Sequence, residues 1–307
     1  MEEIKQIKKI DIHAHATPFR EYYPPYLING EEIAWVSDDH VIEFYEKLNI
    51  ERGVLLALSS PEGKMSPITS EECKFLADKH PDKFFWFCDV DPRAFPNTKN
   101  GDIERIVKHY KKLGAKGVGE LTAHINADDD KLMNLYSACE KLDMPLIIHI
   151  SPTFESSYGI YDDVGLPRIE KILKAFPKLK IIGHSGGFWS EFSANLTEEN
   201  RLEPVSGSVD ESNRIVELLR KYSNLYCDFS ASSGSTALMR DRKFAAKFLN
   251  EFSDRVMYGC DVCTPNQTFQ YDFAEFVEGL VHDGSISFEV YKKFVRENAI
   301  RILKLDM

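Results

Sequence analysis

Short apolar runs alternate with longer segments of helical period along the whole chain, and the alternation repeats eight times. The runs are rich in β-branched and aromatic residues, and several are apolar almost throughout, which is typical of strands buried on both faces. We predict strands over residues 8–15, 52–58, 84–90, 115–121, 145–150, 179–185, 225–230 and 255–261. Because parallel strands need crossover connections, eight successive strand–helix units predict a (β/α)8 TIM barrel, with an open doubly wound sheet as the main alternative.

Helices are predicted between the strands, and several open on Ser or Asp, as N-caps do. Their ranges are 38–48, 70–79, 101–113, 130–142, 166–176, 210–222, 241–252 and 287–303. A single barrel domain over residues 1–307 is expected, because such barrels routinely exceed about 250 residues. Long connections follow the strands at 16–37, 151–165, 186–209 and 262–272, on the face where barrel active sites lie.

Composition excludes several classes of protein. The net charge of −11 argues against a nucleic-acid partner, which requires a basic face. No apolar run approaches about 18 residues and the start MEEIKQIKKI is charged, so we expect a cytoplasmic protein without a membrane segment. Six cysteines are too sparse for a disulfide framework, and the CxxC pair Cys260 and Cys263 lacks a thioredoxin-like context. Mostly buried thiols are expected.

The first predicted strand ends in two histidines, His13 and His15. Residues i and i+2 of an extended strand point to the same side, so both imidazoles can bind one ion at roughly 2.0–2.1 Å. Neutral imidazole suits zinc and related divalent metals. Alone, the pair is equally compatible with two ordinary histidines near a strand end.

Polar side chains at the ends of four further strands favour the metal site. They are Glu120, His149, His184 and Asp261, and in a barrel they converge with His13 and His15 on one mouth. His40, His80, His109 and His282 fall in or beside helical segments and are expected at the surface. His124, just past the fourth strand, is compatible with either place.

The order and spacing of these motifs resemble the amidohydrolase superfamily, in particular the amidohydrolase 2 branch. That branch also contains decarboxylases related to aminocarboxymuconate semialdehyde decarboxylase. The resemblance rests on IDIHAH, DVDPR, GVGEL, LIIHIS, IIGHSGG, MYGCD and ENAIRIL, and it covers essentially the whole chain.

The resemblance implies a role for each residue at the mouth. His13, His15 and His149 would bind the metal, and Asp261 would bind it or take a proton from its water. His184 would be a second ligand or a group that polarises the substrate. A divalent metal, with zinc expected, lowers the pKa of bound water toward about 7, and a neighbouring carboxylate can accept the proton.

Glu120 leaves the number of metal ions open. GVGEL resembles the form found in TatD-type nucleases, in which a glutamate from the middle of the barrel bridges two metals. Glu120 would then be a ligand, with His149 and His184 on the second ion. The alternative is an outer carboxylate that orients the histidines around one ion.

Arg93 and several loop aromatics are candidate substrate-binding residues. Arg93 can clamp a substrate carboxylate through its bidentate fork, or it can form a loop salt bridge. The aromatic side chains either wall an apolar or ring-shaped substrate or pack the loops. They are Tyr22, Tyr23, Trp35, Tyr158, Tyr161 and Trp189.

The segment GHSGG also spells the nucleophile elbow of serine hydrolases. Ser185, Asp261 and His282 follow the chain order of that catalytic triad. The elbow should open a helix directly, whereas FWSEFSANLTEEN is predicted to form a long loop, and the triad leaves the other histidines without a role. We therefore disfavour it.

These observations predict a metal-dependent hydrolase of a small ester, lactone or amide. A nonoxidative decarboxylase on the same barrel is the first alternative, and Arg93 would favour it as a carboxylate anchor. A noncatalytic barrel with a structural metal is the second, although such sites are normally closed by four protein ligands. The expected partner is a small-molecule substrate, and an acidic barrel with long loops is compatible with a homodimer.

Overall fold

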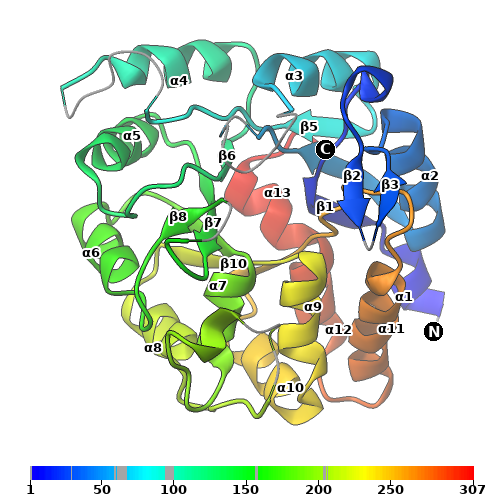
Figure 1. The fold of residues 1–307 in the computed structure, drawn as a ribbon. Helices are drawn as coiled ribbons and strands as arrows, with labels where there is room; N and C mark the ends of the chain where they lie inside the picture. The colour runs from blue at the N-terminus through cyan, green and yellow to red at the C-terminus, as the bar shows by residue number, and fades with distance from the viewer. Residues whose placement is uncertain are drawn as a thin grey trace.

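Parallel strands form the wall of a closed barrel, and helices cover its outside (Figure 1). The computed structural model describes residues 2–28, 30–58, 60, 68–93, 100–155, 158–202, 205 and 207–307. Its barrel strands are β1 (Lys9–Ala14), β4 (Ile50–Leu55), β5 (Phe84–Trp86), β6 (Val118–Leu121), β7 (Leu146–Ser151), β9 (Ile181–His184), β10 (Leu225–Phe229) and β11 (Val256–Tyr258). Each predicted strand range overlaps one of them.

The strands pair in chain order around the barrel. Parallel pairing gives β1-β4-β5 and β6-β7-β9-β10-β11. A parallel bridge between Cys88 and Val118 joins the first group to the second, and one between Ala14 and Val262 closes the ring. The TIM barrel is confirmed, and the open doubly wound sheet is excluded.

Alternating side chains of the strands build two apolar layers. Val54 and Leu56 point into the barrel, whereas Leu55 packs against the outer helices. The interior also contains Phe87, which fits because Gly117 lacks a side chain: a Cβ there would lie 2.3 Å from the Phe87 ring. Residues of the last helix, including Ile302, join this interior cluster. The apolar filling leaves polar side chains to gather at the strand ends.

Most of the predicted helices are present with similar bounds. They are α2 (Asp38–Leu48), α3 (Ser70–Lys79), α4 (Ile103–Lys112), α5 (Asp130–Lys141), α6 (Pro167–Ala175), α8 (Arg214–Lys221) and α10 (Arg242–Glu251). The bounds of α2 and α3 match the prediction, because Ser37 and Thr69 cap their N-termini through side-chain hydrogen bonds. The predicted helix 287–303 is divided into α12 (Phe288–Lys292), a π-helical turn (Lys293–Glu297) and α13 (Asn298–Leu303).

Several further elements were not predicted. They are α1 (Glu2–Gln6), α7 (Gly186–Trp189), α9 (Ala231–Met239), α11 (Phe269–His282), the hairpin β2 (Tyr26–Ile28) with β3 (Glu31–Ile33), the short strand β8 (Ile160–Tyr161) and three short 3-10 turns, at Arg20–Tyr22, Ser190–Phe192 and Asn200–Leu202. The sequence of α9, ASSGSTALM, has low helix propensity, and burial of Ala237 and Leu238 overrides it. Helix α8 begins at Arg214 rather than at residue 210, because Asn213 caps it.

Parts of three predicted loops lie outside the described residues, namely 29, 156–157, 203–204 and 206. None of the helices in the described part of the chain combines the length and the apolar character needed to cross a membrane. The six cysteines are free thiols, and all but Cys263 are buried, which confirms the expectation for most of them.

Candidate metal centre

His13 in β1 and His15 just after it lie side by side at the C-terminal end of the barrel. Their Nε2 atoms are 3.1 Å apart, and both residues are buried. Nδ1 of His15 donates to the carbonyl oxygen of Leu56 at 3.0 Å, so the lone pair of Nε2 faces His13. The common direction predicted from the i, i+2 spacing is confirmed.

Asp11 ties the end of β1 to the end of β11. Its Oδ1 accepts hydrogen bonds from the backbone N–H groups of His13 and Cys260, each at 2.9 Å. Its Oδ2 accepts from the hydroxyl of Tyr45, and burial raises the pKa of Asp11 to about 7. The backbone N–H of Asp261 in turn donates to the carbonyl oxygen of His13 at 2.7 Å. These bonds bring His13 and Asp261 together from opposite ends of the chain.

Glu120 and Asp261 each place a carboxylate oxygen beside the two histidines, and His13, His15 and Asp261 form a candidate group of metal ligands. Glu120 Oε2 lies 3.5 Å from His13 Nε2 and 3.3 Å from His15 Nε2. Asp261 Oδ1 lies 3.6 Å and 3.3 Å from the same two nitrogens. Ligand atoms bound at roughly 2.0–2.1 Å to a tetrahedral zinc ion are about 3.3–3.4 Å apart. The spacing and chemistry of this set therefore fit a divalent metal ion.

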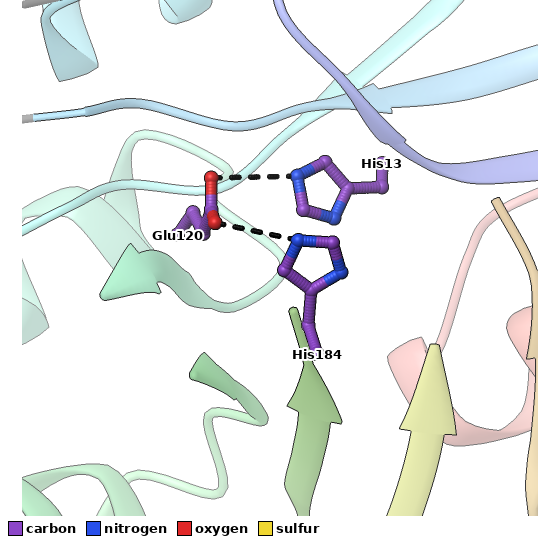
Figure 2. Close-up of side chains that lie close together, drawn as sticks. All are labelled: His13, Glu120 and His184. Atoms are coloured by element: carbon purple, nitrogen blue, oxygen red, sulfur yellow. Dashed lines mark ion pairs between the residues drawn. The ribbon is translucent and has the colours of Figure 1, made fainter. Parts of the chain in front are cut away.

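The other oxygen of Glu120 faces a different pair of histidines. Its Oε1 is hydrogen-bonded to Nδ1 of His149 and lies 3.5 Å from Nε2 of His184. Figure 2 shows the carboxylate with one oxygen toward His13 and the other toward His184. The rings of His149 and His184 are 5.5 Å apart. One oxygen of Glu120 thus lies beside His13 and the other beside His184, and the rings of these two histidines are 4.3 Å apart.

A buried carboxylate, Asp228, orients two of these histidines, and the sequence analysis missed it. Its Oδ2 lies 2.6 Å from Nδ1 of His13 and 3.1 Å from Nδ1 of His184. The hydroxyl of Ser230 donates to the same oxygen at 2.8 Å. With Nδ1 of each ring directed at Asp228, the Nε2 atoms face the mouth. A carboxylate inside the otherwise apolar run LYCDFS was the signal that could have identified it.

The neighbouring histidines keep the carboxylates of Glu120 and Asp261 ionised. Burial raises the pKa of Glu120, but His149, His13 and His15 outweigh it and hold that pKa well below its usual value. Burial likewise raises the pKa of Asp261, and the same kind of histidine contact lowers it overall. A carboxylate set that stays ionised in a buried site suits a divalent cation.

The remaining predicted site residues occupy other positions. Arg93 pairs with the carboxylate of Asp91 at 2.8 Å and donates to the hydroxyl of Ser60, so it takes part in a loop salt bridge. Trp189 is buried and stacks on Phe229 with ring centroids 4.1 Å apart, which makes it a packing residue. Tyr22 is exposed, Trp35 is buried, and the hydroxyls of Tyr23 and Tyr161 bind Glu72 and Asp163. The ring centroid of Tyr158 lies 4.4 Å from that of His149.

The segment after Ser185 differs from the expectation. The helix α7 begins at Gly186, so the prediction of a long loop directly after Ser185 was wrong. The short helix forms where the side-chain-free Gly187 packs closely on the backbone of Ile150. The triad is still not assembled, because the Ser185 hydroxyl donates to the carbonyl oxygen of Ile150 and Asp261 contacts His13 and His15. His282 lines a surface groove beside Arg242.

Substitution of Ser185 by alanine distinguishes a metal site from a serine-hydrolase triad. We expect Ser185→Ala to keep turnover within about threefold of the unchanged protein, because the Ser185 hydroxyl donates to the backbone carbonyl oxygen of Ile150. Loss of a serine nucleophile costs on the order of 10⁶-fold in kcat. Steady-state assays of Ser185→Ala and His282→Ala test this, and a collapse of turnover in both would restore the triad.

Comparisons with known proteins identify the family of the chain and solved structures that share its fold. The model of the amidohydrolase family matches residues 10–305, and the chain belongs to that family. A comparison with curated proteins finds no match.

Solved structures share the barrel at low sequence identity. An amidohydrolase from Burkholderia multivorans with bound zinc superposes with a TM-score of 0.64 at 13% identity, covering 98% of this chain and 100% of the other. The 2,6-dihydroxybenzoate decarboxylase from Rhizobium gives 0.60 at 17% identity, with 97% and 99% covered. A probable 2-pyrone-4,6-dicarboxylic acid hydrolase from Acinetobacter baumannii gives 0.57 at 12% identity, with 97% and 100% covered. Structures that share this fold thus include proteins named as hydrolases and one named as a decarboxylase.

Proposed function

We propose that the protein is a metal-dependent hydrolase of a small ester, lactone or amide, with two divalent ions, zinc foremost, bridged by Glu120. The observation that carries this proposal is that one oxygen of Glu120 faces His13 and His15 while the other faces His149 and His184. His13, His15 and Asp261 would hold one ion, and His149 and His184 the other. A metal bound there supplies a nucleophile near neutral pH by lowering the pKa of a water molecule toward about 7.

Asp261 is the residue best placed to accept a proton from the attacking water. Its side chain is 19% exposed, whereas those of Glu120, His13 and His184 are 5% exposed or less. One oxygen faces His13 and His15, and the other lies 3.8 Å from His184, toward the mouth. A carboxylate that reaches an open mouth also argues against a closed structural metal site.

His184 is proposed to polarise the substrate carbonyl or to bind the second ion. Its Nδ1 is directed at Asp228, and its Nε2 faces Glu120 and Asp261. The ring is therefore fixed and presents one nitrogen to the reacting group.

Decarboxylation would use the same barrel, and the rhizobial neighbour bears the name of such an enzyme. The anchor expected for a substrate carboxylate was Arg93, and its guanidinium is paired with Asp91. The pairing supports hydrolysis over decarboxylation.

An assay of the metal-loaded protein distinguishes the two reactions. A panel of lactones, phenyl esters and anilides is followed for acid release, and a panel of aromatic acids for carbon dioxide. We expect hydrolysis of at least one lactone or ester, with loss of turnover in His15→Ala. Carbon dioxide release with no hydrolysis would replace the proposal by the decarboxylase.

A further inference from the structure

Asp261 has an unusual backbone conformation just after the last barrel strand, β11. Its φ is +52°, in the left-handed region that residues other than glycine rarely adopt, although Asp tolerates it better than most. From there Oδ1 of Asp261 comes within 3.6 Å of Nε2 of His13 and 3.3 Å of Nε2 of His15. Because φ and ψ set the direction of the side chain, the position of this carboxylate depends on the two peptide groups that flank it.

The peptide group before Asp261 is hydrogen-bonded at both ends. The N–H of Asp261 donates to the carbonyl oxygen of His13 at 2.7 Å. The carbonyl oxygen of Cys260 accepts a hydrogen bond from Nε2 of Gln270 at 3.1 Å. Gln270 is the second residue of α11 and is only 1% exposed, so the bond is shielded from water. The peptide plane that determines φ of Asp261 is thus fixed.

The peptide group after Asp261 is held by a second glutamine, Gln267. Its Nε2 donates to the carbonyl oxygen of Asp261 at 3.2 Å. Its Oε1 accepts from the backbone N–H groups of Cys263 at 2.7 Å and Thr264 at 3.0 Å. Two N–H donors directed at one amide atom identify that atom as the oxygen, which places the nitrogen toward Asp261. One side chain therefore closes the turn that carries Asp261.

The backbone matters more for Asp261 than for the other candidate ligands, because its side chain is less enclosed. It is 19% exposed, whereas that of Glu120 is 5% exposed. Packing around the carboxylate therefore confines it less, and a rotation of the backbone would move it directly. A shift of about 1 Å in a reacting group can cost about 100-fold in rate.

We propose that Gln267 and Gln270 are positioning residues that hold the carboxylate of Asp261 over the candidate metal centre, by fixing the peptide groups on both sides of that residue. The inference rests on the proposed function, in which Asp261 binds a metal ion and accepts the proton of the attacking water. It adds two residues that act on this reaction through the backbone of Asp261.

The test compares Gln267→Met and Gln270→Met with Asn266→Ala. Methionine keeps the length of the glutamine side chain but has no amide group to donate or accept a hydrogen bond. Asn266 is exposed on the same loop as Gln267, which makes Asn266→Ala the control. Each protein is loaded with cobalt(II), which binds the same nitrogen and oxygen ligands as zinc and whose visible absorption changes with its ligand set. The absorption spectrum, the cobalt affinity, the melting temperature, and kcat and KM for the best ester or lactone are measured.

We expect Gln267→Met to lower kcat roughly 10- to 100-fold with KM within about threefold, because a misplaced base slows the reaction more than it weakens substrate binding. The cobalt spectrum should change, and the cobalt affinity should fall about 10-fold, because Asp261 is no longer held toward the ion. Gln270→Met should have effects in the same direction, and Asn266→Ala should match the unchanged protein in every measurement.

An unchanged cobalt spectrum and kcat in both glutamine variants would overturn the proposal. A lower melting temperature as their only change would also overturn it, because Gln267 and Gln270 would then stabilise the loop without directing Asp261.

The cobalt measurements separate this inference from the proposed function. If no ester, lactone or amide is hydrolysed but the cobalt spectrum still depends on Gln267, only the proposed reaction fails. If hydrolysis occurs and neither glutamine variant alters the spectrum or kcat, only the role of the two glutamines is rejected. If the unchanged protein binds no cobalt, the metal centre and this inference are both rejected.

Discussion

Replacing His15 by alanine removes most of the bound metal and lowers kcat/KM by about a thousandfold or more. The reason is that His15 Nε2 is 3.1 Å from His13 Nε2 and 3.3 Å from an oxygen of each of Glu120 and Asp261. It therefore lies beside three other candidate ligands. Elemental analysis and steady-state assays of His15→Ala measure both effects.

The same substitution should leave the barrel folded. His15 lies above the apolar interior, which is filled by strand residues such as Ile12 and Leu56. We expect unchanged far-UV circular dichroism and a loss of about 1–3 kcal/mol in the free energy of unfolding, the cost of removing one buried hydrogen-bonded ring. His109→Ala is the control, because that histidine is exposed on α4. A His15→Ala protein with full metal content and activity would refute the assignment of the site.

Replacing Asp228 by asparagine weakens metal binding by roughly 10- to 100-fold. Asp228 Oδ2 accepts from Nδ1 of both His13 and His184, and it is fully buried. An amide keeps the shape but removes the negative charge, so both rings lose a strong acceptor and become poorer ligands. Competition with a chelator of known affinity measures the change.

The variant Asp210→Asn is the control for Asp228→Asn, because Asp210 is exposed and its carboxylate accepts from the backbone N–H and the hydroxyl of Ser212. Equal metal affinities of Asp228→Asn and the unchanged protein would show that Asp228 serves only to fold the end of β10. A loss confined to activity, with metal affinity intact, would move Asp228 from ligand orientation to the reaction itself.

The barrel was predictable because its signals are local and repeated. Apolar runs mark each strand, and Ser37 and Thr69 mark the starts of α2 and α3. Helix α9 was not predictable, because its Ser- and Gly-rich sequence favours other conformations and only burial against the barrel makes it helical. Helix α7 after Ser185 was missed for a similar reason, since Gly187 packs closely on the backbone of Ile150 in β7.

The gathering of polar side chains at the strand ends was predictable, but the pairings among them and the position of Asp228 were not. The rule that strand ends meet at one mouth brought Glu120 together with His13 and Asp261. Spacing along the chain carries no information on which oxygen of Glu120 faces which histidine, because that depends on the relative rotation of β1, β6, β7 and β9. Arg93 shows the same limit of sequence-based prediction. Its residue type suggested that it binds a substrate carboxylate, but it forms an ion pair with Asp91 instead.

The metal content per chain tests whether Glu120 bridges two metal ions. Protein purified without chelators is analysed for metal, alongside Glu120→Ala prepared in the same way. We predict about two equivalents of divalent metal in the unchanged protein and one or fewer in Glu120→Ala. One equivalent in both proteins would contradict the bridge and return Glu120 to the role of an outer carboxylate beside a single ion.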